Sequence, residues 1–216
     1  MQPPILPKEL NYLIDPDGGF LCLSSHWRPK PGDPNPQRPG EKLSMSSYIP
    51  AAPADACLCG SGMPYGRCCR PKPDWQPVCP NPGGQGYSLV KPQSAAFHNV
   101  DDTALRARLS ADARFHCVDD SRNNSFWILW GDPPVEDEYG ILCLGDVELK
   151  KDRTLLIGAM SDLRMQLLLS LLAEIAGDLL GSPKMQYDRA PVIRKQDRPS
   201  ESRRFFGRLG RKRQRR

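Results

Sequence analysis

Four cysteines fall within the thirteen residues Cys57-Leu58-Cys59-Gly60-Ser61-Gly62-Met63-Pro64-Tyr65-Gly66-Arg67-Cys68-Cys69. They form a C-x-C pair, a loop of eight residues and an adjacent C-C pair. Four thiolates that converge on one point make a closed tetrahedral zinc site, with no position left for water or substrate. The sequence therefore predicts one structural zinc ion, bound by Cys57, Cys59, Cys68 and Cys69.

The residues between the cysteines suit a metal-binding turn. Gly60 and Gly62 permit tight backbone turns, and Ser61 can form local hydrogen bonds. Backbone N–H groups of such a turn can point at the sulfur atoms and offset the negative charge of the site. The alternatives are disulfides or unligated thiols. Adjacent cysteines seldom bond each other, cross-pairing in so short a loop is strained, and unligated thiols would be prone to oxidation.

The pattern C-x-C-G-S-G-x-x-Y-x-x-C-C over residues 57–69 resembles the SEC-C motif, the zinc knuckle at the C-terminus of the preprotein translocase motor SecA. The resemblance implies that the four cysteines bind zinc. In the SecA type, basic residues follow the glycines and help to bind the acidic chaperone SecB. Met63 and Pro64 occupy those positions in this chain, so the resemblance does not imply that partner.

Proline is unevenly distributed along the chain. Of 23 prolines in the 216 residues, eighteen lie at or before Pro92 and five follow it. Proline disrupts regular structure, so a packed core is expected after residue 92. The predicted fold class is α+β, with a small zinc knuckle in a Pro-rich N-terminal region and a C-terminal domain of antiparallel sheet and helix. The predicted divisions are a partly irregular region 1–56, a knuckle 57–75, a linker 76–92, an α+β domain 93–185 and a disordered basic tail 186–216.

Apolar patterning predicts the elements of the C-terminal domain. A short helix is expected over residues 104–113, capped from Asp101. Strands are expected at residues 125–130, within 139–149 and at 154–160, because these runs are rich in aromatic and β-branched side chains or alternate in polarity. Ser161 predicts the N-cap of a long helix that ends at Gly181.

This long helix is predicted to anchor the core. Its polar residues recur every four positions as a narrow stripe, and most other positions are apolar: the stripe comprises Gln166, Ser170, Glu174 and Asp178. One sheet covers an apolar face of about 100°. The apolar face of this helix is wider than that, which indicates that it also contacts a second helix or a subunit. Deeper burial within one chain and a homodimer are both left open.

Other residues near the N-terminus give weaker metal signals. Cys22 and His26 have a C-x-x-x-H spacing, but no second pair at the standard spacing follows. A contribution of Cys22, His26 or Cys79 to metal binding is left open. Trp75 is expected to pack on the knuckle, because a small metal domain has little core of its own.

The sequence offers little support for an enzyme. The run Gly83-Gly84-Gln85-Gly86 lacks the Lys-Ser/Thr of a phosphate-binding loop and is expected to be a turn or linker. His116 and Cys117 are neighbours whose side chains face opposite ways in a strand, so they do not make a catalytic pair. Catalysis by the C-terminal domain is left open, with a non-enzymatic role favoured.

The positive charge of the chain is concentrated at its end. Residues 203–216 contain eight Lys and Arg residues and no acid, and Phe205-Phe206 lies among them. Without these eight, 22 basic residues face 25 acidic ones, a net charge of −3 for the body. Such a tail is expected to be disordered and can bind nucleic acid or another polyanion, or merely keep the chain soluble.

Two functional hypotheses follow from these features. The first is a cytoplasmic zinc protein whose knuckle mediates binding to another protein, not identified by the sequence. The second is a nucleic-acid- or ribosome-associated protein that uses residues 203–216, with zinc in a structural role only. No apolar stretch is long enough to cross a membrane, and no secretory signal is visible at the N-terminus, so we expect no membrane contact and a reducing compartment.

Overall fold

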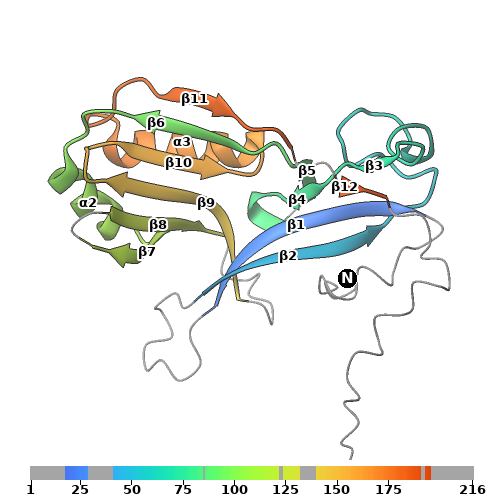
Figure 1. Cartoon of the computed structure of the whole chain (residues 1–216), viewed down its shortest axis with the longest axis horizontal. Helices are drawn as coiled ribbons and strands as arrows, with labels where there is room; N and C mark the ends of the chain where they lie inside the picture. The colour runs from blue at the N-terminus through green and yellow to red at the C-terminus, as the bar shows by residue number, and fades with distance from the viewer. Residues whose placement is uncertain are drawn as a thin grey trace, which may run out of the picture.

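A computed structural model describes residues 18–28, 41–84, 86–121, 124–131, 140–190 and 193–195 (Figure 1). The described chain is mostly β-sheet with two α-helices, and ten strands belong to one curled, mixed sheet. The predicted α+β class is therefore broadly confirmed. None of the described helices is long and apolar enough to cross a membrane.

The C-terminal part of the sheet has the spatial order β11-β6-β10-β9-β8-β7, with every neighbouring pair antiparallel. Its strands are β6 (Gln93–Phe97), β7 (Phe115–Asp120), β8 (Asn124–Trp130), β9 (Ile141–Lys150), β10 (Leu155–Ala159) and β11 (Lys184–Tyr187). The strands predicted at 125–130, 139–149 and 154–160 correspond to β8, β9 and β10. The strands β6, β7 and β11 were not predicted.

One face of this sheet is covered by α2 (Asp102–Ala111) and α3 (Asp162–Ala176) (Figure 1). The alternating residues of the strands that point toward the helices form the main core. Leu172 of α3 and Trp127 of β8 are fully buried there. The predicted N-caps are present: Asp101 accepts from Ala104 N, and Ser161 accepts from Arg164 N.

The end of α3 differs from the prediction, because the helix stops at Ala176 rather than at Gly181. Arg108 of α2 donates to the carbonyl oxygen of Ile175 at 3.0 Å and forms an ion pair with Asp178. The first contact gives the carbonyl of Ile175, in the last turn of α3, a hydrogen-bond donor. The second contact holds the turn that follows α3 against α2. They also show that α3 contacts a second helix, one of the two explanations for its broad apolar face. A homodimer remains a prediction.

The N-terminal region is more regular than the sequence indicated. In the described part of the region 1–56, which was predicted to be partly irregular, β1 (Gly19–Arg28) and β2 (Glu41–Pro50) pair along ten residues each. Residues 20–23, Phe-Leu-Cys-Leu, are apolar enough to predict a short strand, and they are only the start of β1. The rest of the hairpin is rich in serine, which hides its strand character. The proline-rich run at residues 29–39 lies outside the described residues.

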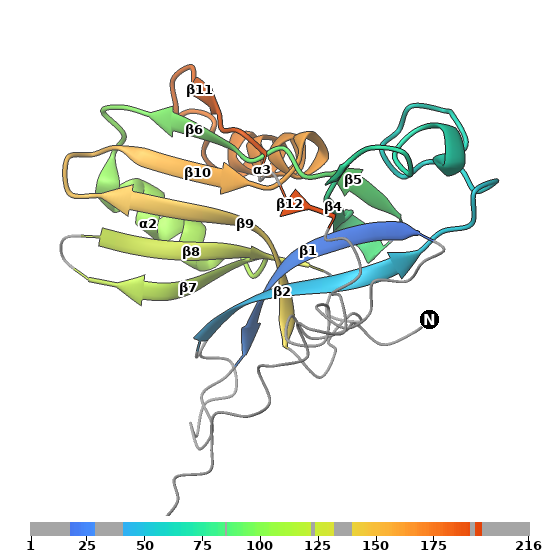
Figure 2. The ribbon, with the colours of Figure 1, turned by 45° about the vertical axis from the view of Figure 1, so that its right-hand side comes forward.

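The segment 76–92, predicted as a linker, contains two strands of the same sheet. These are β4 (Val78–Pro80), parallel to β1, and β5 (Tyr87–Leu89), antiparallel to β4. Because β1 also pairs with β9 at His26 and Trp27, the N-terminal hairpin continues the C-terminal sheet (Figure 2).

A buried arginine joins the two parts. Arg164, in the first turn of α3, is fully buried and donates to the carbonyl oxygen of Pro80 at 2.6 and 2.9 Å and to that of Cys143 at 3.1 Å. These two carbonyls belong to β4 and β9, so one side chain links the helix to both parts of the sheet.

The start of the predicted tail is also ordered in part. Residues 186 and 187 belong to β11, and β12 (Ile193–Arg194) pairs with β3 (Asp74–Trp75) as a separate two-stranded sheet. The prediction of a disordered tail from residue 186 is therefore wrong at these positions. The basic residues 203–216 lie outside the described part of the chain.

Candidate metal centre

The knuckle is a compact turn closed by its own backbone. Cys57 N donates to Met63 O at 3.0 Å, and Gly60 N donates to Cys57 O at 3.1 Å. Gly60 and Gly62 have φ of 75° and 72°, in the left-handed region where residues with a side chain are strained. A short 3-10 helix, η1 (Tyr65–Arg67), then returns the chain to the second cysteine pair.

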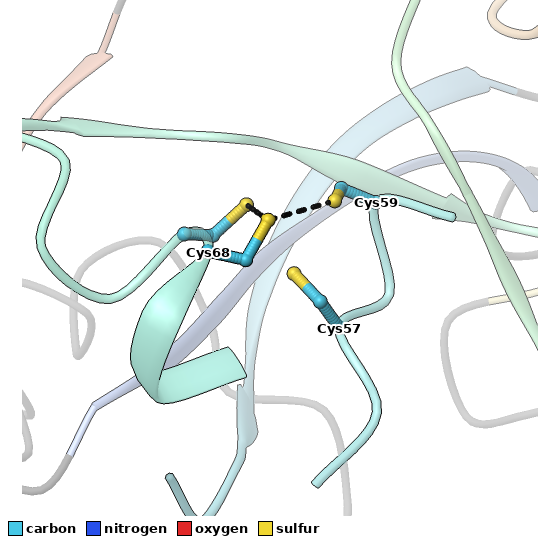
Figure 3. A group of neighbouring side chains, drawn as sticks. Cys57, Cys59 and Cys68 are labelled. Carbon is cyan, nitrogen blue, oxygen red and sulfur yellow. Dashed lines mark hydrogen bonds between the residues drawn. The ribbon is translucent and has the colours of Figure 1, made fainter. Parts of the chain in front are cut away.

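This turn brings the four sulfur atoms together. All four sulfurs lie within 4.8 Å of one another. The Sγ atoms of Cys59 and Cys68 are 3.4 Å apart (Figure 3). Those of Cys68 and Cys69 are 3.8 Å apart. A tetrahedral zinc with bonds of about 2.3 Å requires sulfur separations of about 3.8 Å. The donor set and its spacing therefore fit a zinc ion.

The thiols influence one another strongly. Burial raises the pKa of Cys59, but hydrogen bonds from Ser61, Cys57 and Cys68 outweigh burial and lower that pKa to about 6. Burial, together with the neighbouring thiols, raises the pKa of Cys69, and burial is also the main cause of the raised pKa of Cys57. The thiolate of Cys59 thus forms readily, whereas Cys57 and Cys69 resist ionisation. A bound cation would offset the repulsion between neighbouring thiolates and so favour ionisation of all of them.

Polar groups of the turn support the sulfurs. Ser61 Oγ lies 3.2 Å from Cys68 Sγ. Backbone hydrogen bonds from Cys59 and Ser61 favour the thiolate forms of Cys57 and Cys59, respectively. Each of these backbone N–H groups therefore stabilises the thiolate of the cysteine two positions before it. The sequence predicted such N–H groups, which offset the negative charge of the site.

The knuckle is built into the sheet rather than appended to it. The buried Tyr65 hydroxyl accepts from Gly19 N at 2.8 Å and donates to Gly19 O at 2.9 Å. Its ring lies 4.8 Å from that of Phe20, and both belong to a small core that also contains Cys57, Cys68 and Cys69. In the sequence, Tyr65 stands out only as part of the motif pattern, and no local signal predicts this contact with β1.

The chain also returns to the knuckle near its end. Lys195 Nζ donates to Cys69 O at 2.8 Å and to Arg70 O at 2.9 Å, and lies 5.6 Å from the centre of the Trp75 ring. Trp75 meets Tyr48 of β2 edge-on, with ring centres 6.1 Å apart. The indole therefore lies between the hairpin and a lysine that is bound to the knuckle.

The other candidate residues lie elsewhere. Among the described residues, the four knuckle cysteines are the only potential metal ligands that cluster closely enough to share one ion. His26 Nε2 contacts Ser24 Oγ at 3.1 Å, while hydrogen bonds join Cys22 to Ser47 and Cys79 to Ser161. His116 stacks on Trp130, with ring centres 4.4 Å apart.

The four converging thiols thus form a cysteine knuckle that can hold one metal ion. Residues 54–71 match the SEC-C motif, which confirms the resemblance drawn from the sequence and extends it by a few residues on each side. No curated protein and no solved structure matches the chain.

Proposed function

We propose that this is a cytoplasmic zinc protein in which Cys57, Cys59, Cys68 and Cys69 bind one structural zinc ion. The observation that carries the proposal is the convergence of four sulfurs within 4.8 Å inside a SEC-C motif. Four thiolates complete the tetrahedron, so the metal has no open position for a substrate. Its role would be to hold the knuckle and its neighbours in one conformation.

The zinc assignment is tested by elemental analysis of the purified chain. One zinc per chain is expected for the natural sequence, and none for a Cys59→Ser, Cys68→Ser double variant. Cys117→Ser is the matched control, because Cys117 lies on β7 outside the cluster. Full zinc occupancy in the double variant would refute the assignment.

We further propose that the knuckle binds another protein. Residues 60–64 at its tip are all exposed, and Met63 is 48 % exposed. Beside the tip, a groove of about 320 Å³ separates the knuckle from β5 and α3. Leu58, Tyr87, Leu89 and Leu163 line it, and Leu163 is 43 % exposed. An extended segment of a partner with one apolar side chain would suit this groove, with Lys91 and Asp162 at its polar rim.

A photo-crosslinker at Met63 or Leu163 tests the protein-binding role. Both positions should capture the same partner in cell extract, whereas a crosslinker at the exposed Tyr187 of β11 should not. Leu163→Asp should weaken binding of the captured partner by about tenfold or more, as loss of a central contact does. Equal capture from all three positions would contradict the proposal.

The second candidate function is binding of nucleic acid or ribosomes through residues 203–216, where eight cations occur without an acid. Affinity should then fall steeply with salt, since each phosphate contact contributes about −0.7 to the slope of log K against log salt on single strands and about −0.9 on duplex DNA. Deletion of residues 203–216 should remove both affinity and slope. An unchanged affinity after deletion would exclude this function.

A further inference from the structure

The strand β11 forms one outer edge of the sheet (Figure 1, Figure 2). It pairs with β6 on one side, and none of the described strands pairs with its other side. Asp188 extends the pairing with β6 by one position, since its backbone N donates to Pro92 O at 2.9 Å. An unpaired edge of this kind can accept a further strand.

The backbone of β11 determines which of its residues can bind that strand. Along a strand, the N–H and C=O groups of successive residues point alternately to its two sides. Asp188 N points to β6, so the backbone groups of Gln186 and Lys184 point to β6 as well. Those of Met185 and Tyr187 therefore point away from β6, toward the unpaired side.

The side chains of β11 divide between the two faces of the sheet. Met185 and Tyr187 pair with residues of β6 that are buried on the helix side, so both side chains point to that side. Met185 packs on the main core, whereas the Tyr187 side chain is 70 % exposed. Lys184 and Asp188 point to the opposite face, and both are exposed.

An apolar groove lies beside β11 on the helix side. Its volume is about 310 Å³, and it is lined by residues of α3, of β6 and of the turn before β11, including Leu169, Leu180 and Pro183. This edge of the molecule is therefore apolar on the helix side and charged on the opposite side. A strand that adds to it must match both sides.

We propose that β11 pairs antiparallel with β11 of a second copy of this chain, about a two-fold axis at Gln186, so that the two sheets become continuous. With this axis, Met185 of each copy exchanges backbone hydrogen bonds with Tyr187 of the other, which uses the outward backbone groups of both residues. Lys184 of each copy then lies opposite Asp188 of the other. Opposite charges that face each other across two strands stabilise their pairing.

Charge complementarity favours a second copy over an arbitrary strand. A lysine on an edge strand disfavours pairing with other strands in general. The axis at Gln186 instead gives each Lys184 an acidic partner. Axes at Met185 or at Tyr187 would also satisfy the backbone direction, but both separate Lys184 from Asp188. On the helix side, the proposed pairing brings each exposed Tyr187 ring against Met185 of the other copy, and aromatic rings pack favourably on thioethers.

Disulfide formation between copies of the full, zinc-loaded chain tests the register. The two Gln186 residues would form a non-hydrogen-bonded pair with Cα atoms about 4.5 Å apart, a separation that a disulfide can span. Gln186→Cys should therefore give a disulfide-linked dimer on mild oxidation. Lys184→Cys is the matched control and should not, because the axis separates the two residues 184 by roughly 14 Å. The double variant Lys184→Cys, Asp188→Cys should form the link again.

The natural sequence, oxidised in the same way, controls for its own eight cysteines. A Gln186→Cys protein that forms no link would overturn the proposal, as would equal linkage of Gln186→Cys and Lys184→Cys. The photo-crosslinker at Tyr187 should capture a second copy of this chain rather than the partner of the knuckle.

The charge pairs are tested by sedimentation over a range of protein concentrations. Lys184→Asp places like charges opposite each other at two positions and should raise the dissociation constant of the dimer by about tenfold or more. Adding Asp188→Lys to this variant should restore the affinity. Lys151→Asp, in the exposed turn after β9, is the matched control and should dimerise like the natural sequence. A natural sequence that stays monomeric at every concentration would overturn the proposal.

The backbone pairing is tested by Tyr187→Pro. Proline removes the N–H that points to the unpaired side and leaves the hydrogen bonds to β6 in place, as proline on an edge strand can. The variant should melt like the natural sequence yet remain monomeric. A dimer that persists in both Tyr187→Pro and Lys184→Asp would form through another surface, which would overturn the proposal.

Discussion

Beneath α2 and α3, eighteen buried apolar side chains of the described residues pack into one core, whereas the core around the knuckle contains seven, of which four are cysteines. Both cores belong to the same continuous sheet. At about 25 cal/mol per Å² of apolar area buried, the larger core can stabilise its part of the sheet by hydrophobic burial. The smaller core cannot bury comparable area. A bound metal is the expected compensation, as in other small cysteine-rich folds.

The largest expected effect is that of metal removal on the knuckle. Binding free energy at such sites is on the order of 10–16 kcal/mol and is also folding energy. A Cys59→Ser, Cys68→Ser double variant should lose structure at residues 57–69 and in the start of β1, which shares the small core through Phe20. Hydrogen exchange should show protection lost there and retained in β8 and β9. Loss of protection throughout the chain would show that the two parts of the sheet are not independently stabilised.

The reciprocal change is made in the larger core. Leu172→Asp would bury an unpaired carboxylate under the sheet and should cost about 5 kcal/mol or more, enough to unfold this part. The knuckle should still bind zinc, because all its ligands are local in sequence. Ser170→Asp, at an exposed position of α3, is the control and should melt like the natural sequence. A soluble Leu172→Asp protein with an unchanged melting temperature would contradict the assignment of the core.

The link between the two parts depends on Arg164. Arg164→Met keeps the length of the side chain but leaves the carbonyls of Pro80 and Cys143 without this donor, at a cost of about 3 kcal/mol. Calorimetry should then resolve two transitions where the natural sequence shows one. A single transition at the original temperature would indicate that strand pairing between β1 and β9 suffices to couple the parts.

The smallest expected effect is at the contact between the knuckle and β1. Tyr65→Phe retains the ring against Phe20 but removes both hydrogen bonds to Gly19, which should destabilise the small core by about 1–2 kcal/mol. Zinc content should stay at one per chain, and the affinity for zinc should fall by about tenfold or less, since 1.4 kcal/mol corresponds to a factor of ten. An unchanged zinc affinity would mean that the metal and the hairpin are not coupled through this tyrosine.

The larger core was predictable because its signals are local and strong. Aromatic and β-branched residues in β8 and the N-cap at Ser161 each specify an element within a few positions. The hairpin was missed because serine occupies much of β1 and β2, and their pairing joins residues up to 31 positions apart, as at Gly19 and Pro50. The strands β4 and β5 are only three residues long, and β4 ends at Pro80, so their formation depends on pairing with neighbouring strands.

The sequence by itself determined the candidate metal centre, because four ligands and the two left-handed glycines lie within thirteen residues and need no distant partner. Only the tertiary structure decided what the knuckle is attached to. Tyr65 reaches Gly19 across 46 positions, Arg164 reaches Pro80 across 84, and Lys195 reaches Cys69 across 126. Such contacts place polar side chains on backbone groups that become neighbours only when the sheet has formed, so no local pattern in the sequence specifies them.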